Sequence, residues 1–173
     1  MKILLIQILT VSTFVVINSC RPVQTGTLDY DTLNYDTNRV ALFLWDTTKY
    51  VFPNNSDPLP LAQNDLHVAD SFLQNAIDSF NVTRSPQLYL SFEKVAPIDS
   101  FRINPARYKT QLFPYEDVNG ERIILVIGFS NDFPNWKNEV YEGRLHSGIR
   151  DFRLKINLSQ KLYAKLEIGG YGI

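Results

Sequence analysis

The most regular pattern of apolar residues in the chain predicts one amphipathic helix over residues 63–80. The apolar positions follow one another at intervals of one and three residues, which places them on a single stripe of a helix. Asn64 or Asp65 is expected to cap the first turn, where acidic charge also interacts favourably with the helix dipole. The stripe consists of Leu66, Ala69, Phe72, Leu73, Ala76, Ile77 and Phe80.

Shorter apolar segments predict a set of strands. Residues 39–46 are apolar on both faces and rich in strand formers, which is typical of a strand buried on two sides, and residues 50–52 are its expected partner. Residues 53–60 have the asparagine, aspartate and proline content of a loop. After the helix, strands are expected at residues 87–95, 100–103, 109–115, 123–129, 153–158 and 162–168.

Turn residues connect these strands into a meander. Asn119 and Gly120 form a two-residue hairpin signal, because both tolerate the positive φ of a type I′ turn. Apolar and polar residues alternate over 152–158, as expected for a strand with one solvated face, and residues 157–161 should turn the chain into the last strand. The predicted fold class is α+β, with one main helix packed on an antiparallel meander sheet. This arrangement resembles the cystatin-like architecture, which by itself carries no function.

The first nineteen residues have the pattern of an export signal. Lys2 precedes an apolar stretch, residues 3–17, which is too short for a comfortable bilayer span and has the length of a signal-peptide core. The stretch ends in Ile17-Asn18-Ser19-Cys20, which resembles the lipobox of bacterial lipoproteins. That resemblance implies cleavage before Cys20, diacylglycerol on its thiol and acylation of the new amino group. The alternatives are an ordinary secretory signal that contains a cysteine, and an uncleaved anchor.

Composition agrees with an anchor and narrows the chemistry. Cys20 is the only cysteine, so the chain forms no intrachain disulfide and no thiolate metal site. Without Lys2, 16 basic residues stand against 18 acidic ones, a balance that gives no electrostatic signal for nucleic acid. We expect no cofactor and no metal. The expected organisation is a signal peptide (1–19), a lipidated N-terminus with a polar tether (20–38) and a single α+β domain (39–173).

Tyr108 and Trp136 belong to a set of local motifs in the second half of the chain. The others are Gln111-Leu112-Phe113-Pro114-Tyr115, Asn119-Gly120-Glu121, Lys155-Ile156-Asn157-Leu158 and Tyr163. Together they resemble small uncharacterised lipoproteins of the Bacteroidota, which implies a location without an activity. Surface-exported lipoproteins of that group often carry acids directly after the lipidated cysteine, whereas residues 21–25 have none. We therefore expect attachment to the outer membrane, facing the periplasm.

Two histidines limit the acid–base chemistry available near neutral pH. His67 and Asp70 are three residues apart on the expected helix and Ser71 follows, but His67 falls outside the apolar stripe and is expected to be solvated. His146 lies in an expected loop, without a nucleophile elbow or a phosphate-binding glycine motif. The sequence therefore favours neither histidine as a catalytic residue.

Two further candidate sites involve oxygen ligands and aromatic side chains. A calcium site near the N-terminus is not favoured, because its residues lack the glycine and the distal glutamate of an EF-hand loop. Phe133 and Trp136 form the best candidate for an exposed aromatic binding loop, although Trp136 covering one end of the core is the favoured interpretation. The oxygen-bearing residues are Asp29, Asp31, Asn34, Asp36 and Asn38.

These patterns predict a lipid-anchored cell-envelope protein whose domain is a non-enzymatic binding module. Its expected contacts are the membrane, through lipid on Cys20, and a protein, peptide or glycan partner, but no nucleic acid. The alternatives are a small envelope hydrolase that uses His146 and an inhibitor or immunity-type protein.

Overall fold

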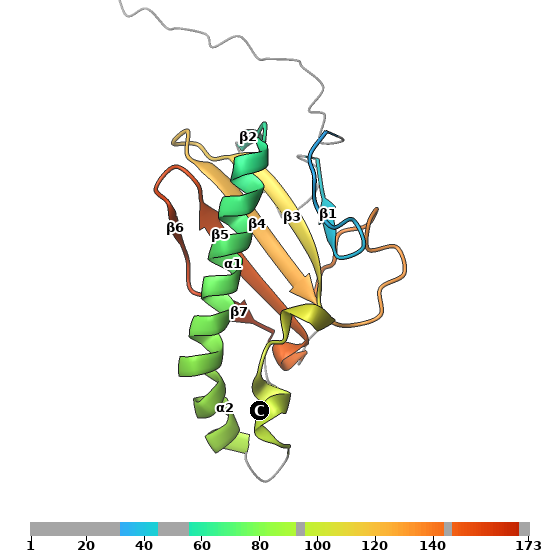
Figure 1. Cartoon of the computed structure of the whole chain (residues 1–173), viewed down its shortest axis with the longest axis vertical. Helices are drawn as coiled ribbons and strands as arrows, with labels where there is room; N and C mark the ends of the chain where they lie inside the picture. The colour runs from blue at the N-terminus through green and yellow to red at the C-terminus, as the bar shows by residue number, and fades with distance from the viewer. Residues whose placement is uncertain (1–31, 45–55, 93–95, 144–146, 170–173) are drawn as a thin grey trace, which may run out of the picture.

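The computed structural model describes residues 32–44, 56–92, 96–143 and 147–169 (Figure 1). The expected signal peptide, Cys20 and His146 lie outside these residues. Three short 3-10 helices are η1 (Ile98–Phe101), η2 (Pro105–Arg107) and η3 (Gly148–Arg150). The other elements are β1 (Val40–Leu42), β2 (Asp57–Pro58), α1 (Gln63–Thr83), α2 (Ser85–Phe92), β3 (Lys109–Glu116), β4 (Arg122–Phe129), β5 (Asp151–Asn157), β6 (Leu162–Tyr163) and β7 (Glu167–Ile168).

The strands form one mixed sheet in the order β1-β3-β4-β5-β6, with β2 also paired to β3 and β7 to β5. The predicted α+β class is confirmed, and β3, β4 and β5 form the expected antiparallel meander. The sheet is not wholly antiparallel, because β1 runs parallel to β3. A parallel pair needs a long crossover, and here the connection contains α1 and α2. The cystatin-like resemblance stays a prediction.

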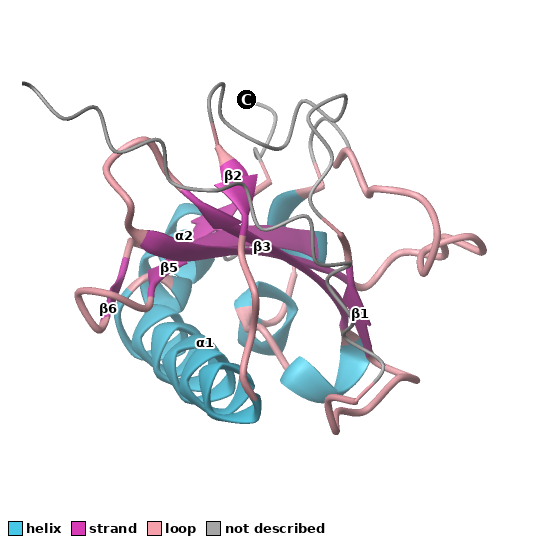
Figure 2. Cartoon of the chain, turned by 90° about the horizontal axis from the view of Figure 1, so that it is seen from above, coloured by secondary structure: helices cyan, strands magenta, loops and turns pink. Residues whose placement is uncertain are grey.

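Helix α1 lies across one face of this sheet (Figures 1 and 2). The predicted apolar stripe is confirmed, because five of its members are buried and Phe72 and Leu73 pack partly buried against the same core. Buried and packed together, these side chains replace water contact with apolar contact, which is the main source of helix stability in a folded domain. The five buried members are Leu66, Ala69, Ala76, Ile77 and Phe80.

The N-terminus of α1 differs from the predicted cap. The N-cap residue is Ala62, so neither Asn64 nor Asp65 holds that position. Asp65 lies three residues further on, where its carboxylate accepts a hydrogen bond from the backbone N–H of Ala62 at 2.8 Å. The same carboxylate pairs with the Arg122 guanidinium at 2.6 Å. Asp65 therefore fixes the start of α1 to β4 as well as satisfying a free N–H at the helix end.

Two of the predicted strands are wrong. Residues 85–92 form the helix α2, and the chain around residues 98–101 forms the 3-10 helix η1. A short apolar segment has no period long enough to separate helix from strand. Pro86 lies in the first turn of α2, where its missing N–H costs no hydrogen bond. The ring of Phe101 then packs against Tyr89 and Phe92, with centroids 6.2 Å apart in both pairs.

Several predicted strands are present with different bounds. The predicted strand over residues 39–46 contributes only Val40–Leu42 to the sheet, and its last two residues and its expected partner lie outside the described residues. Asp57–Pro58, expected in a loop, adds a short strand to the edge of β3. The predicted strand over residues 162–168 is split into β6 and β7, which pair with opposite ends of β5.

The β3–β4 hairpin forms at the predicted place but with a different turn. Asn119 does not adopt a positive φ, whereas Gly120 does, at 75°. The pair Asp117 and Glu121 closes a three-residue loop, through a 3.0 Å hydrogen bond from Asp117 N–H to the Glu121 carbonyl. The Asp117 carboxylate accepts hydrogen bonds from the backbone N–H groups of Glu121 and Asn119, which lowers its pKa below the ordinary value.

Strands β3 and β4 are buried on both faces. One face packs against α1, and the other packs against the chain between β4 and β5, residues 130–143. The Gln111 side chain holds this second layer in place from inside the core, with no exposed surface of its own. Its amide nitrogen donates to the carbonyls of Trp136 and Glu139 at 2.6 and 2.7 Å, and its amide oxygen accepts from Tyr141 N–H at 2.8 Å.

We predict that Gln111→Leu destabilises the domain by roughly 2–4 kcal/mol, because two buried backbone groups and one partly buried one lose their hydrogen-bond partner. Urea unfolding measures the loss. In a Trp45→Phe background, where Trp136 is the one remaining tryptophan, quenching of its fluorescence by acrylamide should increase in the folded state. The exposed Gln87 on α2 provides a matched control, and Gln87→Leu should change stability by less than about 0.5 kcal/mol. Equal effects of the two substitutions would show that Gln111 does not hold this layer.

Candidate functional site: a groove between α1 and the sheet

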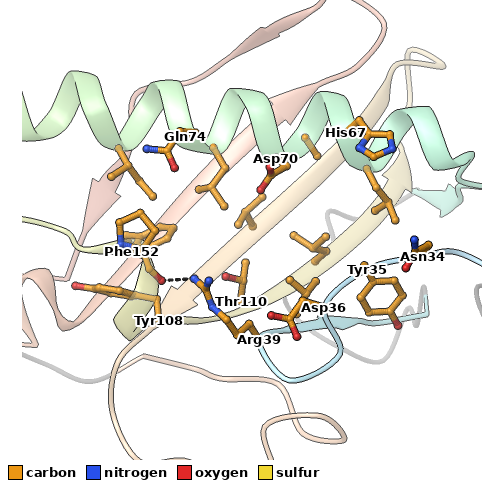
Figure 3. A pocket seen from close by; sticks show the side chains of 18 of the residues that line it. Asn34, Tyr35, Asp36, Arg39, His67, Asp70, Gln74, Tyr108, Thr110 and Phe152 are labelled. Atoms are coloured by element: carbon orange, nitrogen blue, oxygen red, sulfur yellow. Dashed lines mark hydrogen bonds between the residues drawn. The ribbon is translucent and has the colours of Figure 1, made fainter.

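A cavity of about 310 Å³ lies between α1, the chain before β1 and the inner face of the sheet (Figure 3). Its floor is apolar and its opening is polar. Figure 3 shows His67, Asp70 and Gln74 on the helix side of the opening and Tyr35, Asp36 and Arg39 on the opposite side. The buried apolar residues of the floor are Leu66, Ala69, Ile77, Tyr108, Leu112, Val126 and Phe152, and buried Thr110 also lines the cavity. We call this cavity the α1 groove.

The floor of the α1 groove depends on a glycine. Gly128 on β4 is paired with Phe152 on β5, and the Phe152 ring lies where a side chain on residue 128 would extend. The ring of Tyr108 packs beside it with a centroid separation of 5.4 Å. The Tyr108 hydroxyl donates a hydrogen bond to the Ile149 carbonyl. An aromatic ring that covers a cross-strand glycine compensates for the missing side chain, and here it also forms the cavity wall.

The wall opposite α1 is the segment from Asn34 to Arg39, which directly precedes β1 and reaches the sheet at Arg39, whose carbonyl accepts from Thr110 N–H at 2.7 Å. The Gln63 side chain attaches its first residue: Asn34 N–H donates to the Gln63 amide oxygen at 2.8 Å, and the Gln63 amide nitrogen donates to the Asn34 carbonyl at 3.0 Å. At the other end, the Arg39 guanidinium donates to the Pro105 carbonyl. The groove is thus closed by polar contacts at both ends and open between them.

The polar residues at the opening are available to a ligand. The Asp70 carboxylate is exposed and accepts no hydrogen bond from a described residue. His67 is also exposed, and its Nε2 lies 3.5 Å from the Gln63 amide nitrogen. No described carboxylate or hydroxyl contacts the His67 ring, so this part of the chain does not assemble the base and nucleophile of a hydrolytic site. The arrangement is suited to binding: apolar burial below, with hydrogen-bonding and charged groups above.

The structure brings His67 and Asp70 to the same cavity, and His67 is exposed there, as expected for a helix residue outside the apolar stripe. Gln63, His67, Asp70 and Gln74 form a polar line beside the apolar stripe of α1, with spacings of four, three and four residues. This polar line could have indicated the opening of the cavity from the sequence alone. No sequence pattern indicated the opposite wall, because that wall depends on side-chain contacts between segments far apart in the chain.

In the candidate aromatic binding loop, Trp136 is buried in the core and Phe133 is partly buried. Trp136 is only 5% exposed and belongs to the second core layer, which agrees with the interpretation that it covers one end of the core. Phe133 is partly buried against Phe129, with ring centroids 5.9 Å apart. The flanking Lys109 Nζ lies 5.3 Å from the centre of the Trp136 ring. The side chains that would serve as anchors are therefore used for packing.

The described residues include neither a metal cluster nor a helix that could span a bilayer. No group of three or more histidine, cysteine or acidic side chains within them is placed to hold a metal ion. Among the helices described, none has the length and apolar character needed to cross a bilayer. Cys20, His146, Asp29 and Asp31 lie outside the described residues. Comparisons with protein-family models, with curated proteins and with solved structures find no match.

We predict that Gly128→Ala destabilises the domain by roughly 1–3 kcal/mol, because the new methyl group overlaps the Phe152 ring. In a strand with free space the same substitution stabilises, so the sign of the effect reports the overlap. Urea unfolding of Gly128→Ala, Phe152→Leu and the double variant forms a thermodynamic cycle. The cost of Gly128→Ala should fall by at least half when residue 152 is leucine. A cost that is the same in both backgrounds would contradict the proposed contact.

Proposed function

We propose that this protein is a lipid-anchored component of a bacterial cell envelope, and that its domain binds a protein, peptide or glycan partner in the α1 groove. The observation that carries the binding proposal is the groove itself. It combines a buried apolar floor with an opening that presents Asp36, Asp70 and His67. Concave sites of this composition are the usual ligand sites of small domains.

The size of the groove limits what enters it. A volume of about 310 Å³ accommodates one or two apolar side chains, or one face of a sugar ring, and not a whole folded element. The rest of the partner would lie across the opening, where Asp70 and Gln74 offer hydrogen bonds. A protein or peptide that inserts an apolar side chain satisfies both requirements, and we place it first among the three classes.

The two alternative functions differ in what they require of the groove. A hydrolase that uses His146 requires a nucleophile and an acid beside that residue. His146 does not line the α1 groove, so the groove gives no support to this alternative. An inhibitor or immunity-type protein is a special case of the binding proposal, in which the partner is an enzyme or a toxin. The identity of the partner separates this case from the general one.

The anchor proposal depends on the N-terminal pattern. One acyl chain binds a membrane only reversibly, and the three chains implied by a lipobox cysteine anchor a protein stably. The polar segment after Cys20 would then connect the lipid to the domain. The absence of acids in residues 21–25 supports attachment that faces the periplasm.

We predict that a photo-crosslinker at the groove captures the partner. The full-length protein with p-benzoylphenylalanine in place of Gln74 should give a discrete adduct after irradiation of intact cells, because that side chain lies at the opening. Mass spectrometry then identifies the adduct as protein, peptide or glycan. The control places the same group at Val82, which is 76% exposed on α1 but does not line the groove. Equal labelling from both positions, or none from position 74, would exclude the groove as the binding site.

We predict separately that Cys20→Ser abolishes incorporation of radiolabelled palmitate and either releases the protein from the membrane or leaves it there as uncleaved precursor. The reason is that serine has no thiol to receive diacylglycerol, so the proposed cleavage and acylation do not follow. Fluorography after immunoprecipitation measures the label, and wild-type protein is the positive control. Persistent labelling of the variant would refute the anchor at Cys20 and leave the groove proposal intact.

A further inference from the structure

We infer that a second cavity, at the other end of α1, binds the phosphate group of an anionic ligand. This cavity has a volume of about 970 Å³ and is separated from the α1 groove by a shared wall of Pro105 and Tyr108. It lies among the C-terminal half of α1, the segment that contains η1 and η2, the end of β4 and η3. We call it the arginine cavity.

The first reason to expect an anion in this cavity is the positive charge of its lining. Arg102, Arg107 and Arg150 all line the arginine cavity, and the one acidic residue among its lining residues is Asp99. The lining therefore carries a formal charge of +2, in a chain whose formal net charge is −1. Positive charge gathered around one concavity attracts anions more strongly than the same charge dispersed over a surface.

The second reason to expect an anion is that the guanidinium groups are free to bind one. The side chains of Arg107 and Arg150 are exposed and form no hydrogen bond or ion pair with any other described residue. Arg102 contacts Asp99 at 3.7 Å, but the two side chains are 51% and 85% exposed. An ion pair this exposed contributes little and is readily exchanged for a better partner.

The backbone that carries these arginines is fixed. Asn81 on α1 holds Ile103 through two reciprocal 2.8 Å hydrogen bonds, next to Arg102. The Asn104 side chain accepts a hydrogen bond from Ala106 N–H at 3.1 Å and so caps η2, which ends at Arg107. On the opposite side, the Arg150 carbonyl accepts from Ser130 N–H at 2.8 Å. Binding would therefore order three side chains without also ordering loops, which lowers its entropic cost.

Phosphate is the anion that this arrangement fits best. A guanidinium group donates two parallel hydrogen bonds to a pair of phosphate oxygens, and a phosphate monoester carries enough charge and enough oxygens for more than one arginine. A single carboxylate carries one charge and two oxygens, so it would leave part of the lining unmatched. The ligand is either a soluble phosphate ester or the phosphodiester headgroup of a lipid, which share this chemistry.

Isothermal titration calorimetry on the full-length protein in non-ionic detergent tests the inference with two probes. Inorganic pyrophosphate represents soluble phosphates, and glycerophosphoglycerol represents a lipid headgroup. We expect saturable binding of at least one probe, weakened by sodium chloride because the contacts are charged. Arg107→Gln/Arg150→Gln should weaken that binding by about tenfold or more, since several charge-assisted hydrogen bonds are lost. The probe that binds more tightly identifies the source of the phosphate.

Two controls keep the test specific. Lys165→Gln removes the same kind of charge from an exposed residue that does not line the cavity, and it should change the affinity by less than about twofold. Arg107→Lys/Arg150→Lys keeps the charge and should retain an intermediate affinity. Circular dichroism confirms that each variant is folded. Absence of saturable binding to either probe, equally tight binding of acetate, or binding unchanged in the glutamine double variant would each overturn the inference.

Discussion

The buried amide of Gln111 makes a two-sided sheet feasible in so small a domain. Because β3 and β4 are apolar on both faces, each face needs its own cover. Helix α1 covers one face by apolar packing. The other is covered by a connection without regular structure, whose backbone groups would be costly to bury unpaired. Gln111 satisfies three of those groups at once, so the connection can pack Trp136 and Tyr141 against the sheet.

A side-chain amide that bonds the backbone of a distant segment is also found at both candidate sites. Gln63 and Asn81, near opposite ends of α1, each bond the N–H and the carbonyl of one residue on a distant segment. An amide side chain suits this role because it carries a donor and an acceptor side by side. The first contact places the outer wall of the α1 groove, and the second holds the chain that carries Arg102. Loops positioned in this way on a rigid helix provide binding surfaces without further strands.

Periodicity explains how much of this could be predicted from sequence. Helix α1 and strands β3, β4 and β5 were predicted because their apolar patterns extend over at least seven residues. Helix α2 was missed because its eight residues make little more than two helical turns, too few to show a helical period, although a strand period of two repeats several times in that length. The cap at Ala62 was missed because alanine carries no capping group. The polar line of His67 and Asp70 was visible, but not its opposite wall. That wall depends on a contact between Asn34 and Gln63, which are 29 positions apart, and no local pattern records such a contact.

The three amides have one further property, which is that none of them titrates. Loops held by carboxylates or histidines detach when pH or ionic strength changes, because their contacts rest on charge. Contacts made by Gln63, Asn81 and Gln111 are neutral on both sides, so neither acidification nor salt weakens them directly. These three contacts are therefore insensitive to acid and salt, whereas the Asp65–Arg122 ion pair at the start of α1 and the charged residues at the cavity openings respond to both.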